Sequence, residues 1–177
     1  MARTMKRIAL ISVILTPLFF LLQQRFGFLE PLTITCATTA YHLLMRFAVG
    51  GAVNVVMKNR ADCSRRWYRL LPFEEKLYRK LGIRRFKDRL PTYDPTLFSL
   101  QLHNPLEIAQ AMCQAEVVHE IIVPLSFLPL AAAPRLGALP VFLLTSLAAA
   151  LFDLTFVILQ RYNRPRMMRL IEQKKKL

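Results

Sequence analysis

Four apolar stretches, separated by charged or turn-forming segments, dominate the pattern of hydrophobic and polar positions along the chain. Stretches of this length and purity predict membrane-spanning helices rather than the amphipathic helices of a soluble domain. We therefore expect an all-α, polytopic membrane protein with about four transmembrane helices in a single membrane domain, 1–177. The predicted spans are 8–22, 32–57, 117–130 and 136–159.

The third predicted span is the shortest and carries Pro124 and Pro129, so its pattern is the weakest of the four. The first contains Pro17, a kink that a membrane helix tolerates better than a soluble one. It continues through bulky residues with no small-residue cleavage motif, which predicts an uncleaved span rather than a signal peptide.

Between the second and third spans, the segment 58–103 mixes apolar and basic residues at roughly helical spacing, as in WYRLLPFEEKLYRKLGI. This pattern is typical of short amphipathic helices that lie in the membrane interface. The segment holds twelve Lys/Arg, the tail 160–177 holds seven and the N-terminal stub three, whereas the two opposite loops hold one each. The positive-inside rule therefore places both termini and the central loop in the cytoplasm, with the protein in the cell membrane.

The formal net charge of +14 would suggest nucleic-acid binding in a soluble protein. Here the basic residues flank apolar runs, so we expect membrane lipids as partners and no nucleic acid. The three cysteines, Cys36, Cys63 and Cys113, are scattered and predict no disulfide framework. The sequence does not predict the oligomeric state.

Ionisable residues inside the spans are the first candidates for catalytic residues, because a charge in lipid is costly unless it is paired. Glu116 and His119 stand at i and i+3, on one face of the third span. A carboxylate can orient an imidazole for general-base work on a hydroxyl. The alternative is a polar pair that only anchors the end of the helix. Glu-x-x-His also occurs in di-metal bundles, but a second copy is absent, so we expect no metal.

Asp153 of the fourth span lies about 10 Å inside the cytoplasmic boundary. Arg46 of the second span lies somewhat deeper, and its long side chain can bridge the difference. We expect them to form an intramembrane ion pair, with a structural role in helix packing as the simplest interpretation.

The segment that follows the fourth span interleaves arginines with other polar side chains at the membrane surface. Arginine forks bind phosphate and carboxylate bidentately, so this segment is a candidate site for an anionic donor. Its residues are Arg161, Tyr162, Asn163, Arg164 and Arg166.

Three segments, EKLYRKLGIRRFKDRLP (75–91), CQAEVVH (113–119) and QRYNRPRMMRL (160–170), resemble the glycosyl-4,4'-diaponeurosporenoate acyltransferase family. Members are small bacterial membrane proteins associated with the final acylation of carotenoids. The chain keeps Glu116 and His119 of the family pattern. It departs from that pattern at other polar positions, namely Ala111, Gln114, Glu120 and Asp153, and has Phe86 in place of a tryptophan.

The resemblance implies transfer of a fatty acyl group to a hydroxyl of a glycosylated carotenoid or another lipid-like acceptor at the cytoplasmic face. The co-substrate would be an acyl thioester, on coenzyme A or an acyl carrier protein, with no bound cofactor. His119, oriented by Glu116, would act as the base, and Asn163 would stabilise the oxyanion. The predicted donor-binding set is Arg161, Tyr162, Arg164 and Arg166, together with Lys87.

A second hypothesis remains open from the sequence. The chain would then be a non-catalytic membrane protein that binds anionic lipid or a partner membrane protein through its basic faces.

Overall fold

The computed structural model describes residues 2–83 and 94–175. Within this part the chain is helical, and four helical segments are long and apolar enough to cross a membrane. The expected fold class is thereby confirmed. The chain divides into two compact units, Met1–Gly50 with Ile121–Phe152, and Gly51–Glu120 with Asp153–Leu177. We call them unit 1 and unit 2 and describe each by itself.

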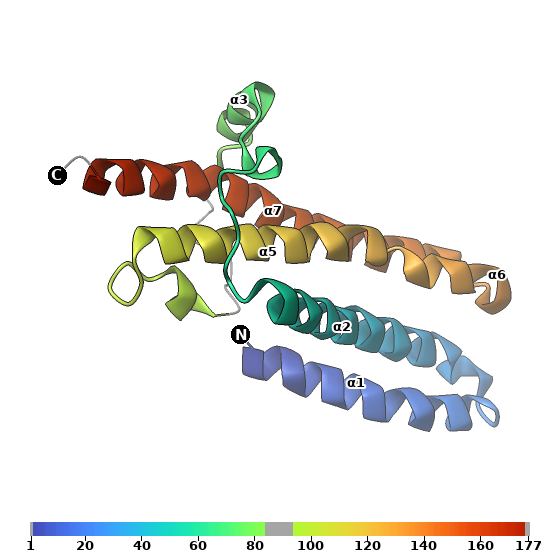
Figure 1. Cartoon of the computed structure of the whole chain (residues 1–177). Coiled ribbons are helices and arrows are strands. Elements are labelled where there is room, and N and C mark those ends of the chain that lie inside the picture. Colours follow the sequence, from blue (N-terminus) through green and yellow to red (C-terminus); the bar gives the residue numbers. More distant parts are fainter. Residues whose placement is uncertain (1, 84–93, 176–177) are drawn as a thin grey trace. The chain divides into compact units, whose positions relative to one another are not determined.

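Unit 1 begins with α1 (Ala2–Gln23), a 3-10 turn (Gly27–Leu29) and the first part of α2 (Glu30–Met57). The turn reverses the chain, so that α1 and α2 are antiparallel neighbours (Figure 1). Threonine hydroxyls in α2 donate to carbonyls one turn earlier, as Thr38 does to Ile34 at 2.7 Å. Such bonds satisfy polar side chains within an apolar helix.

The rest of unit 1 comprises the last residues of α5 (Pro105–Leu125), the short α6 (Ala133–Leu136) and the first part of α7 (Leu139–Lys175). Gly137 ends α6 in the left-handed conformation, at φ +64°, which a glycine adopts without strain. A core of Ile34, Ala133 and Phe142 packs beside this turn.

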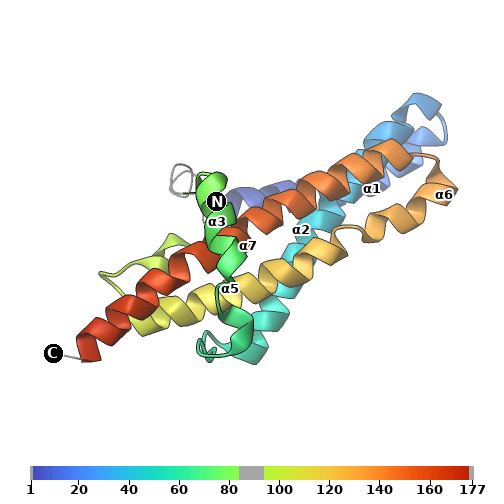
Figure 2. The same ribbon diagram turned by 90° about the horizontal axis from the view of Figure 1, so that it is seen from above.

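Unit 2 contains the end of α2, a 3-10 turn (Arg66–Tyr68), α3 (Pro72–Lys80), most of α5 and the C-terminal part of α7. In both views α7 runs beside the first half of α5 (Figures 1 and 2). A core cluster joins them: Ile108, Ala109 and Met112 pack with Met167.

Two helices extend well beyond the predicted spans. Helix α5 begins at Pro105 rather than near 117, because Asn104 and Glu107 cap it reciprocally through bonds of 2.9 and 3.1 Å. Helix α7 continues through most of the predicted tail, to Lys175, and includes Pro165. Some polar residues of these stretches are buried between the two helices, namely Gln114, Glu116, Gln160, Arg161 and Arg164.

Candidate functional site

The polar residues of unit 2 gather on the facing sides of α5 and α7. On α7 the buried residues recur every three or four positions, so they form one face of the helix. That face begins with Asp153, continues through Gln160, Arg161 and Arg164, and ends at Met167. It therefore presents two cations and an anion to the interior of unit 2.

Arg161 lies at the centre of this face and binds two carboxylates. Its Nε and Nη2 donate to the two oxygens of Glu74 on α3, at 2.6 and 2.9 Å, a bidentate pair. Its Nη1 donates to Glu116 Oε1 at 2.6 Å. It also donates to the carbonyls of Trp67 and Arg69, at 3.1 and 3.0 Å. The guanidinium thus ties α3 and the chain before it to α5 and α7.

Arg164, one turn further along α7, completes the cluster. It donates to the second oxygen of Glu116 and to the carbonyl of Tyr68, and its guanidinium lies 5.1 Å from the centre of the Tyr68 ring. Glu116 is fully buried, and each of its oxygens accepts a bond from an arginine. We call Glu74, Glu116, Arg161 and Arg164 the arginine–glutamate cluster; its formal charges sum to zero.

Glu74 links this cluster to the start of α3. Its Oε2 accepts the Leu71 backbone N–H at 2.6 Å, which caps the helix, and its Oε1 accepts the Tyr78 hydroxyl at 2.8 Å. Burial raises the pKa of Glu74, but the bonds from Arg161, Leu71 and Tyr78 outweigh it, and the pKa lies below its ordinary value of 4.5. Burial and the bond to Glu74 raise the pKa of Tyr78.

This pKa shift predicts an acid-dependent loss of stability. A carboxyl with a depressed folded-state pKa stabilises the fold above its unfolded pKa, near 4.5, and loses that contribution as the pH falls through the folded value. We expect Glu74→Gln to flatten the decline in unfolding temperature below about pH 4.5. Glu75→Gln, at the exposed neighbouring position, is the control and should keep the wild-type decline.

A second constellation lies on the same two helices. His119 Nδ1 is 2.8 Å from Asp153 Oδ1, and the Phe156 ring stacks on the imidazole with centroids 4.8 Å apart. Asp153 is fully buried, whereas the His119 side chain is 22% exposed. An ionised carboxylate only accepts, so Nδ1 is the donor in this contact, and Nε2 is the ring nitrogen left to exchange a proton with a substrate. This is the geometry of an oriented general base.

The comparison with protein families matches residues 64–173 to the glycosyl-4,4'-diaponeurosporenoate acyltransferase family, which is more than half of the chain. The chain belongs to this family. Comparisons with curated proteins and with solved structures gave no match. In this glycosyl-4,4'-diaponeurosporenoate acyltransferase family member, the matched segment includes both the arginine–glutamate cluster and the His119–Asp153 pair. Helices α1 and α2 lie entirely outside it.

The partner expected for His119 was wrong. The sequence spacing predicted that Glu116 would orient the imidazole, but both Glu116 oxygens bind arginines, and Asp153 of α7 binds His119. The i, i+3 spacing places the two side chains on one helix face without requiring that they meet. The ion pair predicted between Arg46 and Asp153 joins residues of different units, and it stays a prediction.

The residues predicted to bind the acyl donor lie in different environments. Arg161 and Arg164 are buried in the arginine–glutamate cluster, the half-buried Tyr162 ring contacts Tyr78, Asn163 is half-buried, and Arg166 is exposed. Lys87 lies outside the described residues. Among the described residues, no group of three His, Cys, Asp or Glu side chains is placed to hold a metal ion.

Gln114 has a structural position that the sequence did not reveal. Its Oε1 accepts the Asn59 backbone N–H at 2.7 Å, and its Nε2 donates to Asn54 at 3.1 Å. Lys58 and Asn59 both have positive φ, 49° and 54°, so the chain leaves α2 through a strained turn. Gln114 thus fastens the end of α2 to α5.

Replacing Gln114 by alanine should lower the free energy of unfolding by about 1–3 kcal/mol, because the Asn59 N–H loses its partner. Denaturant titration of the purified protein measures this change. Gln101→Ala, at an exposed glutamine, is the control. An unchanged midpoint in Gln114→Ala would show that water replaces the amide without cost.

Two cysteine side chains are in contact next to the arginine–glutamate cluster. The Cys113 thiol donates to Cys63 Sγ at 3.4 Å, and both are free thiols. This bond lowers the pKa of Cys63, and the Arg164 charge lowers it further, against the opposing effect of burial.

Proposed function

We propose that this chain is a membrane acyltransferase that transfers a fatty acyl group from a thioester to a hydroxyl of a glycosylated carotenoid or another lipid-like acceptor. The observation that carries the proposal is the His119–Asp153 pair, because it supplies an oriented base that is accessible on one side. Family membership supports the reaction class, and four helices able to span a membrane suit an acceptor dissolved in lipid.

In the proposed reaction, His119 Nε2 accepts the proton of the acceptor hydroxyl while Asp153 holds Nδ1–H. The hydroxyl oxygen attacks the thioester carbonyl carbon and forms a tetrahedral oxyanion. The C–S bond then breaks, the imidazolium returns its proton to the leaving thiolate, and an ester and a free thiol result. Asp153 stabilises the imidazolium through its buried carboxylate. No cofactor is consumed in this scheme.

The arginine–glutamate cluster has a positioning role in this proposal. Its donors hold the carbonyls of Trp67, Tyr68 and Arg69, so the cytoplasmic segment before α3 keeps a fixed place beside α5 and α7. Of the predicted donor-binding residues, Arg166 is exposed and is the described arginine best suited to a donor phosphate. Asn163 keeps its proposed role at the oxyanion, and Lys87 its proposed role at the donor.

We place the protein in the cell membrane with both termini in the cytoplasm. The loop charges support this orientation through the positive-inside rule. A cytoplasmic site is consistent with a thioester donor, which cells make in that compartment.

The test is product analysis by mass spectrometry. Membranes containing the wild-type protein are supplied with a long-chain acyl-coenzyme A and a glycosylated carotenoid, and parallel membranes come from cells with an empty vector. A new ester in the wild-type sample alone supports the proposal. No ester with any long-chain thioester, from protein that is inserted and folded, would contradict it.

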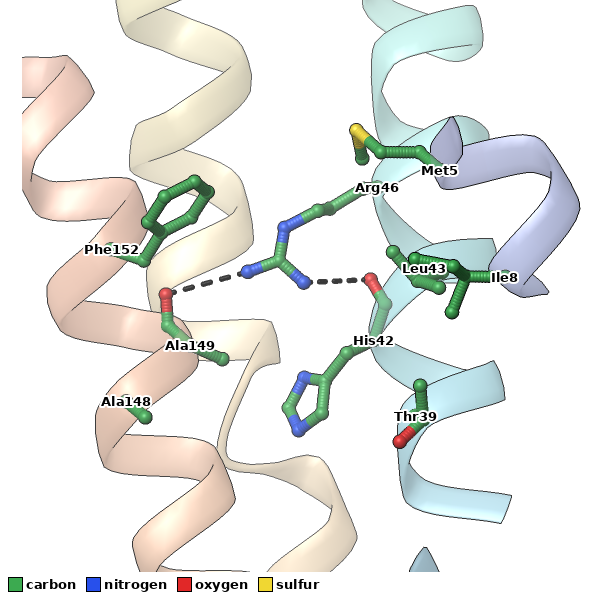
Figure 3. Close-up of a pocket in the computed structure, with 9 residues that line it drawn as sticks. All are labelled: Met5, Ile8, Thr39, His42, Leu43, Arg46, Ala148, Ala149 and Phe152. Atoms are coloured by element: carbon green, nitrogen blue, oxygen red, sulfur yellow. Dashed lines mark hydrogen bonds between the residues drawn. The ribbon is translucent and has the colours of Figure 1, made fainter. Parts of the chain in front are cut away.

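A second candidate is a non-catalytic protein that binds anionic lipid or a partner membrane protein. Trp67, in the 3-10 turn before α3, and Phe73, in the first turn of α3, are 65% and 61% exposed, and basic side chains flank them. In the described part of the chain, neither the hollow beside Arg46 (Figure 3) nor the one beside Arg60 has Glu116 or His119 in its wall. Tight binding to vesicles containing phosphatidylglycerol, in a protein that makes no ester, would favour this candidate.

A further inference from the structure

Two free thiols are in contact inside unit 2, and the proposed reaction uses neither of them. Cys63 lies in the segment between α2 and the 3-10 turn Arg66–Tyr68, and Cys113 lies in α5. The Cys113 thiol donates to Cys63 Sγ at 3.4 Å, so the sulfurs are in van der Waals contact. Cys113 also packs with Ala61 and Tyr68 in a buried cluster. Because these residues lie on either side of Cys63 in the chain, the segment is held against α5.

The two thiols differ in access and in charge environment. Cys63 is partly exposed, whereas Cys113 is fully buried. The Cys113 S–H bond and the Arg164 guanidinium favour the Cys63 thiolate, and they lower the pKa of Cys63 against the opposing effect of burial. The thiolate is the form of cysteine that attacks oxidants. Cys63 is therefore the thiol that reacts first, and Cys113 is placed to react second.

We propose that Cys63 and Cys113 are a site of reversible oxidation, at which a hydroperoxide converts the two thiols into a disulfide. In the first step the Cys63 thiolate attacks one oxygen of the peroxide. The O–O bond breaks, the other oxygen departs as hydroxide or alkoxide, and Cys63 sulfenic acid forms. In the second step the Cys113 sulfur attacks Cys63 Sγ, the S–O bond breaks, and the departing hydroxide takes up the Cys113 proton as water. The thiols lose two electrons, and the peroxide gains them.

A cytosolic thiol reverses the reaction by thiol–disulfide exchange. Disulfides in a reducing compartment are usually transient and redox-sensing, so this pair suits a sensor of peroxide rather than a permanent cross-link.

The disulfide closes a long loop beside the arginine–glutamate cluster. Glu116 lies one turn after Cys113 on α5. Tyr68, whose carbonyl accepts a bond from Arg164, lies five residues after Cys63. Oxidation therefore fixes the two chain segments that the cluster joins, and the oxidised protein should unfold at a higher SDS fraction than the reduced protein.

The experiment treats the full-length protein in mild detergent with hydrogen peroxide and maps its thiols by alkylation and peptide mass spectrometry. We expect a Cys63–Cys113 disulfide that dithiothreitol reduces. Cys36, a partly exposed thiol of α2 in unit 1, is the internal reference. It should react at least about 10-fold more slowly than Cys63, because no thiol or arginine favours its thiolate in the same way.

Three variants separate the two steps. Cys113→Ala should stop the reaction at Cys63 sulfenic acid, which dimedone labels. Cys63→Ala should leave Cys113 unoxidised, because that thiol is buried. Cys36→Ala is the matched control and should form the disulfide at the wild-type rate.

Four outcomes would overturn the proposal. They are a Cys63 that oxidises no faster than Cys36, a Cys63 sulfenic acid that persists in the wild-type protein, a disulfide between Cys63 residues of two copies of the chain, and an SDS midpoint that does not rise on oxidation. All four are measured on the wild-type protein, so a variant that fails to fold does not affect them. Oxidation requires neither a thioester nor an acceptor, so this test and the ester-formation test of the proposed reaction fail independently.

Discussion

Replacing Asp153 by asparagine is expected to slow acyl transfer by about 10²–10⁴-fold, the range that a positioned general base contributes. Asparagine can present its amide N–H to Nδ1, which favours the imidazole tautomer with the proton on Nε2 and removes the lone pair that accepts the acceptor's proton. His119→Ala should lose a similar factor. Rates are measured in membranes with saturating acyl-coenzyme A and acceptor.

The double variant separates positioning from a general structural effect. If Asp153 acts through His119, then Asp153→Asn adds no further loss to His119→Ala, since the two residues work as one unit. Glu172→Gln, which removes an exposed carboxylate from the same helix as Asp153, should keep wild-type activity. Full activity in Asp153→Asn would remove the proposed role of the pair.

Glu116→Gln should destabilise the folded protein by about 3–5 kcal/mol, the usual cost of removing one partner from a buried ion pair. The substitution leaves Arg164 buried without its carboxylate and leaves Arg161 with Glu74 alone. The free energy of unfolding is measured by titrating the purified protein from mild detergent into SDS, followed by circular dichroism.

A compensating variant identifies the cause of this loss. Adding Arg164→Met to Glu116→Gln removes the unpaired cation and should restore part of the stability, because the remaining Glu74–Arg161 pair is neutral. Glu172→Gln, at an exposed position of α7, serves as the surface control. A Glu116→Gln protein as stable as the wild type would show that the cluster is not a source of stability.

The sequence predicted the fold class correctly because lipid imposes strong rules. A spanning helix must be long and apolar, and both features can be recognised from the hydrophobic pattern of the sequence. The helix ends were harder to predict. Polar residues such as Gln114 lowered the apolar signal of α5, although each finds a partner inside unit 2. A hydropathy pattern does not distinguish a polar residue in a loop from one that is buried and bonded.

The candidate site was predicted in part. Residue spacing identified Glu116 and His119 as candidate site residues, and the basic segment after the fourth span contained Arg161 and Arg164. Their partners were not predictable, because Glu74 and Asp153 come from helices distant in sequence, and pairing depends on how those helices pack. One local signal for Glu74 was present: it lies three residues after Leu71, where a glutamate can cap the start of a helix.

The arginine–glutamate cluster and the His119–Asp153 pair both use residues of one uninterrupted stretch of α7. An insertion or deletion within this stretch would therefore affect how both face α5. Asp153 and Arg161 are eight positions apart, which corresponds to about 12 Å along the axis. Inserting or deleting a single residue between them would rotate one relative to the other by about 100°. Both could then no longer face α5 together. Exposed side chains in this interval, such as Leu154, are therefore open to variation in identity, whereas the number of residues is fixed by the period of the helix.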